Sequence, residues 1–248
     1  METMERPIES TGGRSKTELR RVVLGLIIFS ASFGYVEAAV VAYLRSIYNP
    51  LRARFYPGNF GDVFPLLSLQ QLQALGPEHI FRLKTELARE FATLLMLAGA
   101  ALVGARKPRE WVAAFLVCFG IWDLTFYIFL KLLLSWPASL LTWDILFLIP
   151  VPWTGPVLAP ILVSISMIAC GLVLLSREYN NQPLHLTRWK WTFIVGGGAL
   201  IVAAFVWDFR NTASGGNPNP FNWLLFTGGE AIGVGAFVMS LRHASRTS

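Results

Sequence analysis

Long apolar runs dominate the chain and alternate with short stretches rich in charged residues and proline. A hydrocarbon layer about 30 Å thick needs about 20 apolar helical residues to cross it. The apolar run 91–105 is too short by itself, so its helix has to begin near Glu86. With that extension, the sequence predicts six membrane-spanning helices, at residues 22–44, 86–105, 111–134, 155–175, 191–207 and 223–241.

Residues 136–160 form the largest apolar segment that does not fit this scheme. Pro137 favours the start of a helix, while Pro150, Pro152, Pro156 and Pro160 interrupt any regular continuation. The apolar part is about 13 residues long, too short for a seventh crossing. We therefore expect a re-entrant or interfacial half-helix over residues 137–149, followed by an extended linker.

Residues 65–76 predict a second segment that does not cross the membrane. Pro65 stands where a helix could start, and Gly76 with Pro77 would end it. Leucines recur along one side, and serine and glutamines occupy the other. Such a short helix would cap the bundle or lie on the membrane surface.

Composition supports a membrane protein. Of the 248 residues, 54% are hydrophobic and 15% are charged, whereas soluble domains carry about 25% charged residues. These values exclude an ordinary soluble fold and a disordered chain. The predicted fold class is all-α, a polytopic membrane helical bundle. We expect a polar N-terminal tail at residues 1–19, a six-helix transmembrane domain at 20–242 and a C-terminal tail at 243–248.

The basic residues indicate how this bundle is oriented. Thirteen of the 21 Lys and Arg residues fall in the two tails and in the second and fourth connections, which all lie on one side. By the positive-inside rule, both termini are cytoplasmic and the protein is integral to the plasma (inner) membrane. The net charge of +6 follows from this asymmetry, so we expect no nucleic-acid partner.

Ionisable residues inside the predicted spans are the main candidates for function, because each is costly in lipid. Four acids from four helices lie about 6–16 Å below the outer boundary, and none lies in the cytoplasmic half of a span. Helical spacing places other polar side chains on the same helix faces as these acids. The candidates for binding a substrate or a proton are Glu37, Glu86, Arg89, Glu90, Asp123, Tyr127, Lys131 and Glu230.

Three of the four aspartates follow a tryptophan. Asp144 and Asp208 are only secondary candidates. A Trp anchors at the membrane interface, so an aspartate next to it can reach water without having a functional role. Asp123 is too deep for that explanation and is the strongest single candidate. Arg and Lys residues at the same level could instead neutralise all these acids, which would make them structural.

The side chains inside the spans limit the available chemistry. All three histidines lie outside the spans and the two cysteines are isolated, so we expect no metal and no cofactor. No motif supports an enzyme class, which favours a protein that is not an enzyme. Carboxylates, Arg and Lys can still bind protons, ions or an anionic headgroup.

Three hypotheses follow. The first is a small proton-linked transporter with a carboxylate-lined site in the outer half of the bilayer. The second is an accessory or structural subunit of a membrane complex, and the third an intramembrane enzyme acting on a lipid or lipid-linked substrate. The expected partners are the lipid bilayer, a small ion, solute or lipid headgroup, and possible partner subunits.

Overall fold

The computed structural model describes residues 16–58, 63–184 and 186–244, and these are mostly helical. Six helices are long and apolar enough to cross a membrane. The chain is therefore a multi-pass, all-α membrane bundle, as predicted. The expected tails fall largely outside the described residues. The long helices are α1 (Lys16–Phe55), α3 (Pro77–Gly104), α4 (Pro108–Leu134), α5 (Leu158–Tyr179), α6 (Arg188–Val206) and α8 (Trp223–Ala244).

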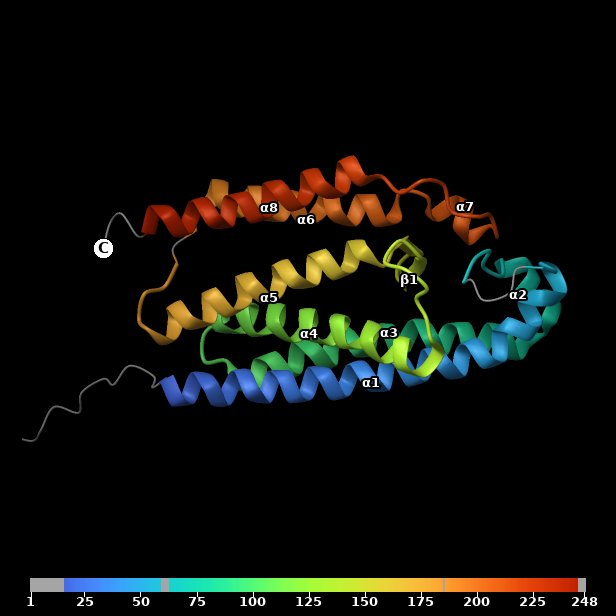
Figure 1. Cartoon of the computed structure of the whole chain (residues 1–248), viewed down its shortest axis with the longest axis horizontal. Coiled ribbons are helices and arrows are strands. Elements are labelled where there is room, and N and C mark those ends of the chain that lie inside the picture. Colours follow the sequence, from blue (N-terminus) through green and yellow to red (C-terminus); the bar gives the residue numbers. More distant parts are fainter. Residues whose placement is uncertain (1–15, 59–62, 185, 245–248) are drawn as a thin grey trace, which may run out of the picture.

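The long helices run along one common axis (Figure 1). Helix α1 begins and α8 ends at the same end of the bundle, which we call the terminal end. The opposite end carries the short helices α2 (Leu69–Leu75) and α7 (Phe209–Ala213) and a two-stranded sheet, and we call it the hairpin end.

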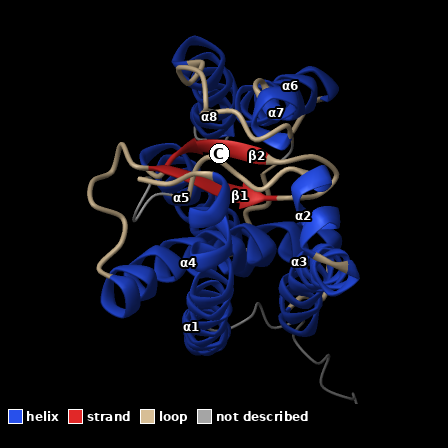
Figure 2. Ribbon diagram, turned by 90° about the vertical axis from the view of Figure 1, so that its right-hand side faces the viewer, coloured by secondary structure: helices blue, strands red, loops and turns tan. Residues whose placement is uncertain are grey.

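The bundle has two parts. Helix α4 packs against α1, α3 and α5, whereas α6 and α8 pack on each other. The pair α6 and α8 meets the rest through α5 and the sheet. Viewed from the hairpin end, the two strands lie between this pair and helices α1, α3 and α4 (Figure 2).

The sheet replaces the half-helix that we expected over residues 137–149, and that prediction is wrong. Strand β1 (Trp143–Phe147) pairs with β2 (Trp153–Pro156) in an antiparallel hairpin. Prolines on both sides restrict helix formation, and the β-branched and aromatic residues between them suit a strand. Asp144 lies opposite Gly155 in the register, and an irregularity follows Ile145. The segment was correctly excluded as a seventh span.

Helices α1 and α3 are longer than the apolar runs that predicted them. Helix α1 has 40 residues, which corresponds to about 60 Å, or about twice the thickness of a hydrocarbon layer. It continues past residue 44 to Phe55, and α3 begins at Pro77, where the sequence allows a helix to restart, and runs unbroken into the second span. The apolar run therefore marks the part of the helix suited to lipid, and the polar continuation forms the hairpin end.

Helix α2 caps this end, as the sequence suggested, but it begins later than Pro65. Ser68 is its N-cap, and the hydroxyl of Ser68 accepts a hydrogen bond from the Gln71 main-chain N–H. The Gln71 side chain accepts in turn from the Ser68 N–H at 2.8 Å. This capping box satisfies two N–H groups that a helix start leaves without partners, so Ser68 determines where the helix begins.

Candidate functional site

A cavity of about 290 Å³ lies at the hairpin end, between α1, α3, α4 and β1. Apolar side chains form much of its wall, and nine charged side chains, some acidic and some basic, share it. Five of these are carboxylates and four are arginines. They are Glu37, Glu86, Glu90, Asp123 and Asp144, and Arg45, Arg52, Arg82 and Arg89.

Arg89 is the centre of one cluster in this cavity. It lies on α3, and its guanidinium forms salt bridges with Glu37 of α1 and Glu86 of its own helix. The Thr93 hydroxyl also donates to Glu37, at 2.6 Å. A planar guanidinium can bind two carboxylates at once. Arg89 therefore neutralises Glu37 and Glu86 and links α1 to α3.

Glu90 belongs to the same helix but has a different environment. It is 7% exposed, and its carboxylate accepts a hydrogen bond from the Leu148 main-chain N–H at 2.8 Å. Leu148 directly follows strand β1. Within the described residues Glu90 forms no salt bridge. The Leu148 N–H therefore links the hairpin to α3 through Glu90.

Asp144 of β1 is buried, which corrects our expectation that it reaches water beside Trp143. The Tyr127 hydroxyl donates to it at 3.0 Å, and the Arg45 guanidinium lies 4.0 Å from its other oxygen. Arg45 itself lies over the Trp136 ring, 3.9 Å from the centroid. Burial raises the pKa of Asp144 to about 6, although Arg45 and Tyr127 both favour its charged form.

Asp123 of α4 is a buried carboxylate with a single side-chain hydrogen bond to the residues that the structure describes. It is 7% exposed, and the Ser164 hydroxyl of α5 donates to it at 2.8 Å. Among the described residues, no Lys, Arg or His side chain forms a salt bridge with it. Gly120 allows this arrangement, since a Cβ there would lie 2.6 Å from the Ser164 carbonyl oxygen. The close approach of α4 and α5 thus brings Ser164 to Asp123.

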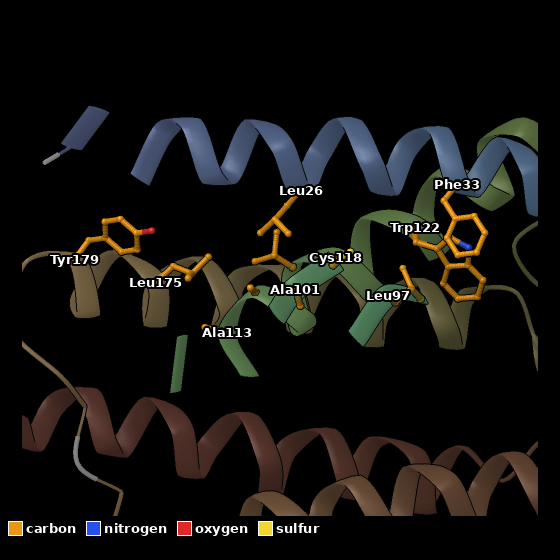
Figure 3. Close-up of a cluster of buried hydrophobic side chains, with 11 residues drawn as sticks. Leu26, Phe33, Leu97, Ala101, Ala113, Cys118, Trp122, Leu175 and Tyr179 are labelled. Atoms are coloured by element: carbon orange, nitrogen blue, oxygen red, sulfur yellow. The ribbon is translucent and has the colours of Figure 1, made fainter. Parts of the chain in front are cut away.

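A cluster of apolar side chains from α1, α3, α4 and α5 extends from the cavity toward the terminal end (Figure 3). Trp122 and Phe33 lie at one end of this cluster and Tyr179 at the other. Trp122 also lines the cavity. The apolar cluster therefore begins where the cavity ends.

The structure brings six of the eight primary candidates to this one cavity. They are Glu37, Glu86, Arg89, Glu90, Asp123 and Tyr127, and the secondary candidate Asp144 joins them.

The other candidates lie elsewhere. Lys131 is exposed and donates to the carbonyl oxygens of Ser135 and Pro137. Glu230 of α8 accepts from the Ser166 hydroxyl of α5 at 3.0 Å and is not among the residues that line the cavity. Asp208 binds asparagine side chains in the loop after α6.

Arg45, Arg52 and Tyr48 were not among our candidates, although they line the cavity. They follow Glu37 along α1, with Arg45 eight residues on, Tyr48 three further and Arg52 four further. These spacings put them on one helix face. The signal was therefore present, but it lay beyond the apolar run that we took as the end of the helix.

A second charged cluster lies at the terminal end, just outside the predicted spans. Glu110 at the start of α4 and Glu178 at the end of α5 are 3% and 7% exposed. Glu110 accepts from the Arg106 main-chain N–H at 2.8 Å, and the Arg106 guanidinium reaches Glu18 at 2.9 Å. Lys107 lies 3.9 Å from Glu178. These contacts join α1, α4 and α5 and are structural.

No protein-family model, no curated protein and no solved structure matches the chain. In the part of the chain that the structure describes, no group of three or more His, Cys, Asp and Glu side chains is placed to hold a metal ion. The polar groups that the cavity offers are chiefly carboxylate, guanidinium and phenol groups. Their common chemistry is charge pairing, hydrogen bonding and the binding of protons.

Proposed function

We propose that the protein is a small proton-linked carrier and that the cavity is its solute site. The observation that carries this proposal is Asp123, a buried carboxylate that lines the cavity and forms no salt bridge with a described residue. An isolated charge in such surroundings is strongly disfavoured. Asp123 is therefore stable in two states, with a proton bound or with a cationic group of a solute beside it.

This alternation between a proton and a solute is what proton-linked transport requires. A carrier also needs a path that can be closed on one side of the site. The apolar cluster between the cavity and the terminal end would supply that closure (Figure 3). The basic residues favour a cytoplasmic terminal end in the plasma membrane. In this orientation the structure corresponds to a state whose solute site faces outward.

The two other hypotheses account for less of the cavity. A purely structural subunit would neutralise its acids, as Arg89 does for Glu37 and Glu86. Asp123 and Glu90 do not follow that pattern, because each accepts hydrogen bonds without a salt bridge among the described residues. An enzyme acting on a lipid would use the same cavity, but it would convert its substrate into a product and would not need a pH gradient.

The test uses the full chain reconstituted in phosphatidylcholine vesicles with a pH-sensitive dye inside. After a pH gradient is imposed across the vesicle membrane, amino acids, sugars, monocarboxylates and organic amines are added to separate samples. We expect one class to dissipate the gradient in wild-type vesicles. Asp123→Asn removes the titratable group but keeps an acceptor for Ser164, and it should abolish this proton flux.

Glu230→Gln is the matched control, because Glu230 also accepts from a serine of α5 but lies outside the cavity lining. It should behave as wild type. The proposal is wrong if no class moves protons, or if Asp123→Asn carries the same flux as wild type. Chemical analysis of the solute after transport separates a carrier, which leaves it intact, from an enzyme.

A further inference from the structure

We propose that the solute is an organic cation, with an ammonium group attached to an apolar body. This inference rests on the proposed carrier function and names its substrate class. It comes from three features of the cavity: the balance of its buried charges, the aromatic rings around Asp123, and the partners that already occupy its arginines.

The charge balance around Asp123 is negative. Glu37, Glu90, Asp123 and Asp144 are each at most 7% exposed. Glu86 lines the cavity with them, and the guanidinium groups of Arg45, Arg52, Arg82 and Arg89 share its wall. When all nine groups are ionised, the cavity carries an excess of one negative charge. A ligand with a positive charge is the complement of that excess.

Aromatic rings form the wall beside these carboxylates. Trp122, Phe126, Tyr127 and Phe147 all line the cavity. The Trp122 ring lies 6.3 Å from both the Phe126 and the Phe147 rings, and the Phe126 and Tyr127 rings are 5.1 Å apart. Faces of aromatic rings attract ammonium groups within about 6 Å of the centroid. Carboxylates next to such rings are typical of sites that bind organic cations.

An anionic solute fits less well, because the arginines closest to the carboxylates already have partners. Arg89 is held by Glu37 and Glu86, and Arg45 by the Trp136 ring and Asp144. An anion would have to displace these carboxylates into a buried, apolar setting. The cavity volume of about 290 Å³ is at the lower end of the range for small-molecule sites.

Exchange with protons follows from the groups that face Asp123. These are Tyr127 of its own helix, Asp144 of β1 and Ser164 of α5, with Arg45 of α1 beyond Asp144. When the ammonium group binds, the proton on the Asp123 carboxyl leaves to solution. One positive charge enters and one leaves, so the exchange is electroneutral and the buried site keeps its net charge.

The experiment measures binding of benzyltrimethylammonium to the full chain in phosphatidylcholine nanodiscs by calorimetry. Benzyl alcohol and benzenesulfonate serve as neutral and anionic probes of similar size. We expect the cation to bind at least tenfold more tightly than either. Its Kd should rise as the pH falls, by up to tenfold per pH unit, because protons and the cation compete.

Two substitutions, Asp123→Asn and Phe147→Leu, localise the site, and Glu230→Gln is the control. Asp123→Asn should weaken binding of the cation at least tenfold and remove most of the pH dependence of its Kd. Glu230→Gln should change neither the Kd nor its pH dependence. Phe147→Leu should weaken binding of the cation severalfold without changing the weak binding of benzyl alcohol, because only the attraction between the ammonium group and the Phe147 ring is lost. This second variant keeps the test valid if Asp123→Asn fails to fold.

The inference is overturned if benzenesulfonate or benzyl alcohol binds as tightly as the cation. Binding of the cation that is unchanged in both Asp123→Asn and Phe147→Leu would also overturn it. These results leave the carrier proposal intact if another solute class still drives proton flux that depends on Asp123. Absence of any proton flux, with the cation still bound at Asp123, would instead remove transport and keep the cation site.

Discussion

Glycines bring helices into close contact in both parts of the bundle, at Gly120 between α4 and α5 and at Gly197 between α6 and α8, but the first part also buries several charged side chains. Gly197 and Gly229 let the backbones of α6 and α8 approach so closely that a Cβ at either residue would lie 2.6 Å from the other's carbonyl oxygen. Close packing of small residues is a common basis of helix association in membranes. Around the cavity, α1, α3 and β1 are instead joined by Arg89, Glu37 and Glu90.

The difference supports the proposed function, because the buried charges gather at the cavity. Small residues hold two helices together without burying any charge. Buried charges give little net stability, because desolvation offsets most of their attraction. A bundle that can associate through glycines, and does so in α6 and α8, has no structural need for five carboxylates at one cavity.

The largest effect is expected from removing Arg89. Arg89→Met leaves Glu37 buried without its cation, which should cost about 3–5 kcal/mol of stability. The measurement is the yield and melting temperature of the purified protein. Adding Glu37→Gln and Glu86→Gln to Arg89→Met should restore much of the loss. An Arg89→Met protein that melts like wild type would show that the cluster does not hold α1 to α3.

A smaller effect is expected in the glycine contact. Gly197→Ala forces α6 and α8 apart and should cost about 1–3 kcal/mol, as overpacking does in other cores. Gly196→Ala is the matched control, because a Cβ at Gly196 meets nothing within 4 Å. Melting temperatures measure both. Binding of benzyltrimethylammonium to the folded Gly197→Ala protein should be unchanged, and equal melting of the two variants would argue against the close contact.

The third prediction concerns pH and Asp144. Its pKa rises from 3.8 to about 6 on burial, so its stabilising contribution is complete below pH 4 and is lost as the pH rises through 6. The loss is about 2–3 kcal/mol by pH 7. Tyr127→Phe removes the hydrogen bond that favours the charged form and should raise this pKa further.

Infrared spectroscopy measures this change through the C=O band of the protonated Asp144 carboxyl, identified by its absence in Asp144→Asn. The band should disappear near pH 6 in wild type and at higher pH in Tyr127→Phe. A midpoint that moves to lower pH would contradict the proposed hydrogen bond.

The sequence predicts the membrane bundle well, because length and hydropathy depend on the solvent that surrounds each helix. The same argument located Glu37, Glu90 and Asp123 near one level, since helical rise converts residue number into depth. It could not determine which helices are neighbours. Glu230 lies at a comparable distance from its helix end, yet α8 packs on α6 and does not reach the cavity.

The hairpin could not be predicted from apolar periodicity. Residues 137–149 are apolar and bounded by prolines, which is compatible with a short helix or with a strand. The pairing of β1 with β2 depends on a partner segment that the first strand does not specify. Asp144 was therefore assigned to the membrane surface, whereas the register turns it toward Tyr127 and Arg45.

The hydrogen bond from the Leu148 N–H to Glu90 has a further consequence. This main-chain amide depends on a side-chain oxygen at the cavity wall and not on a neighbouring strand. A solute that engages the Glu90 carboxylate competes for that oxygen and leaves the amide open to hydrogen exchange. Under the proposed function, the exchange rate of the Leu148 amide would therefore report a solute that binds at Glu90.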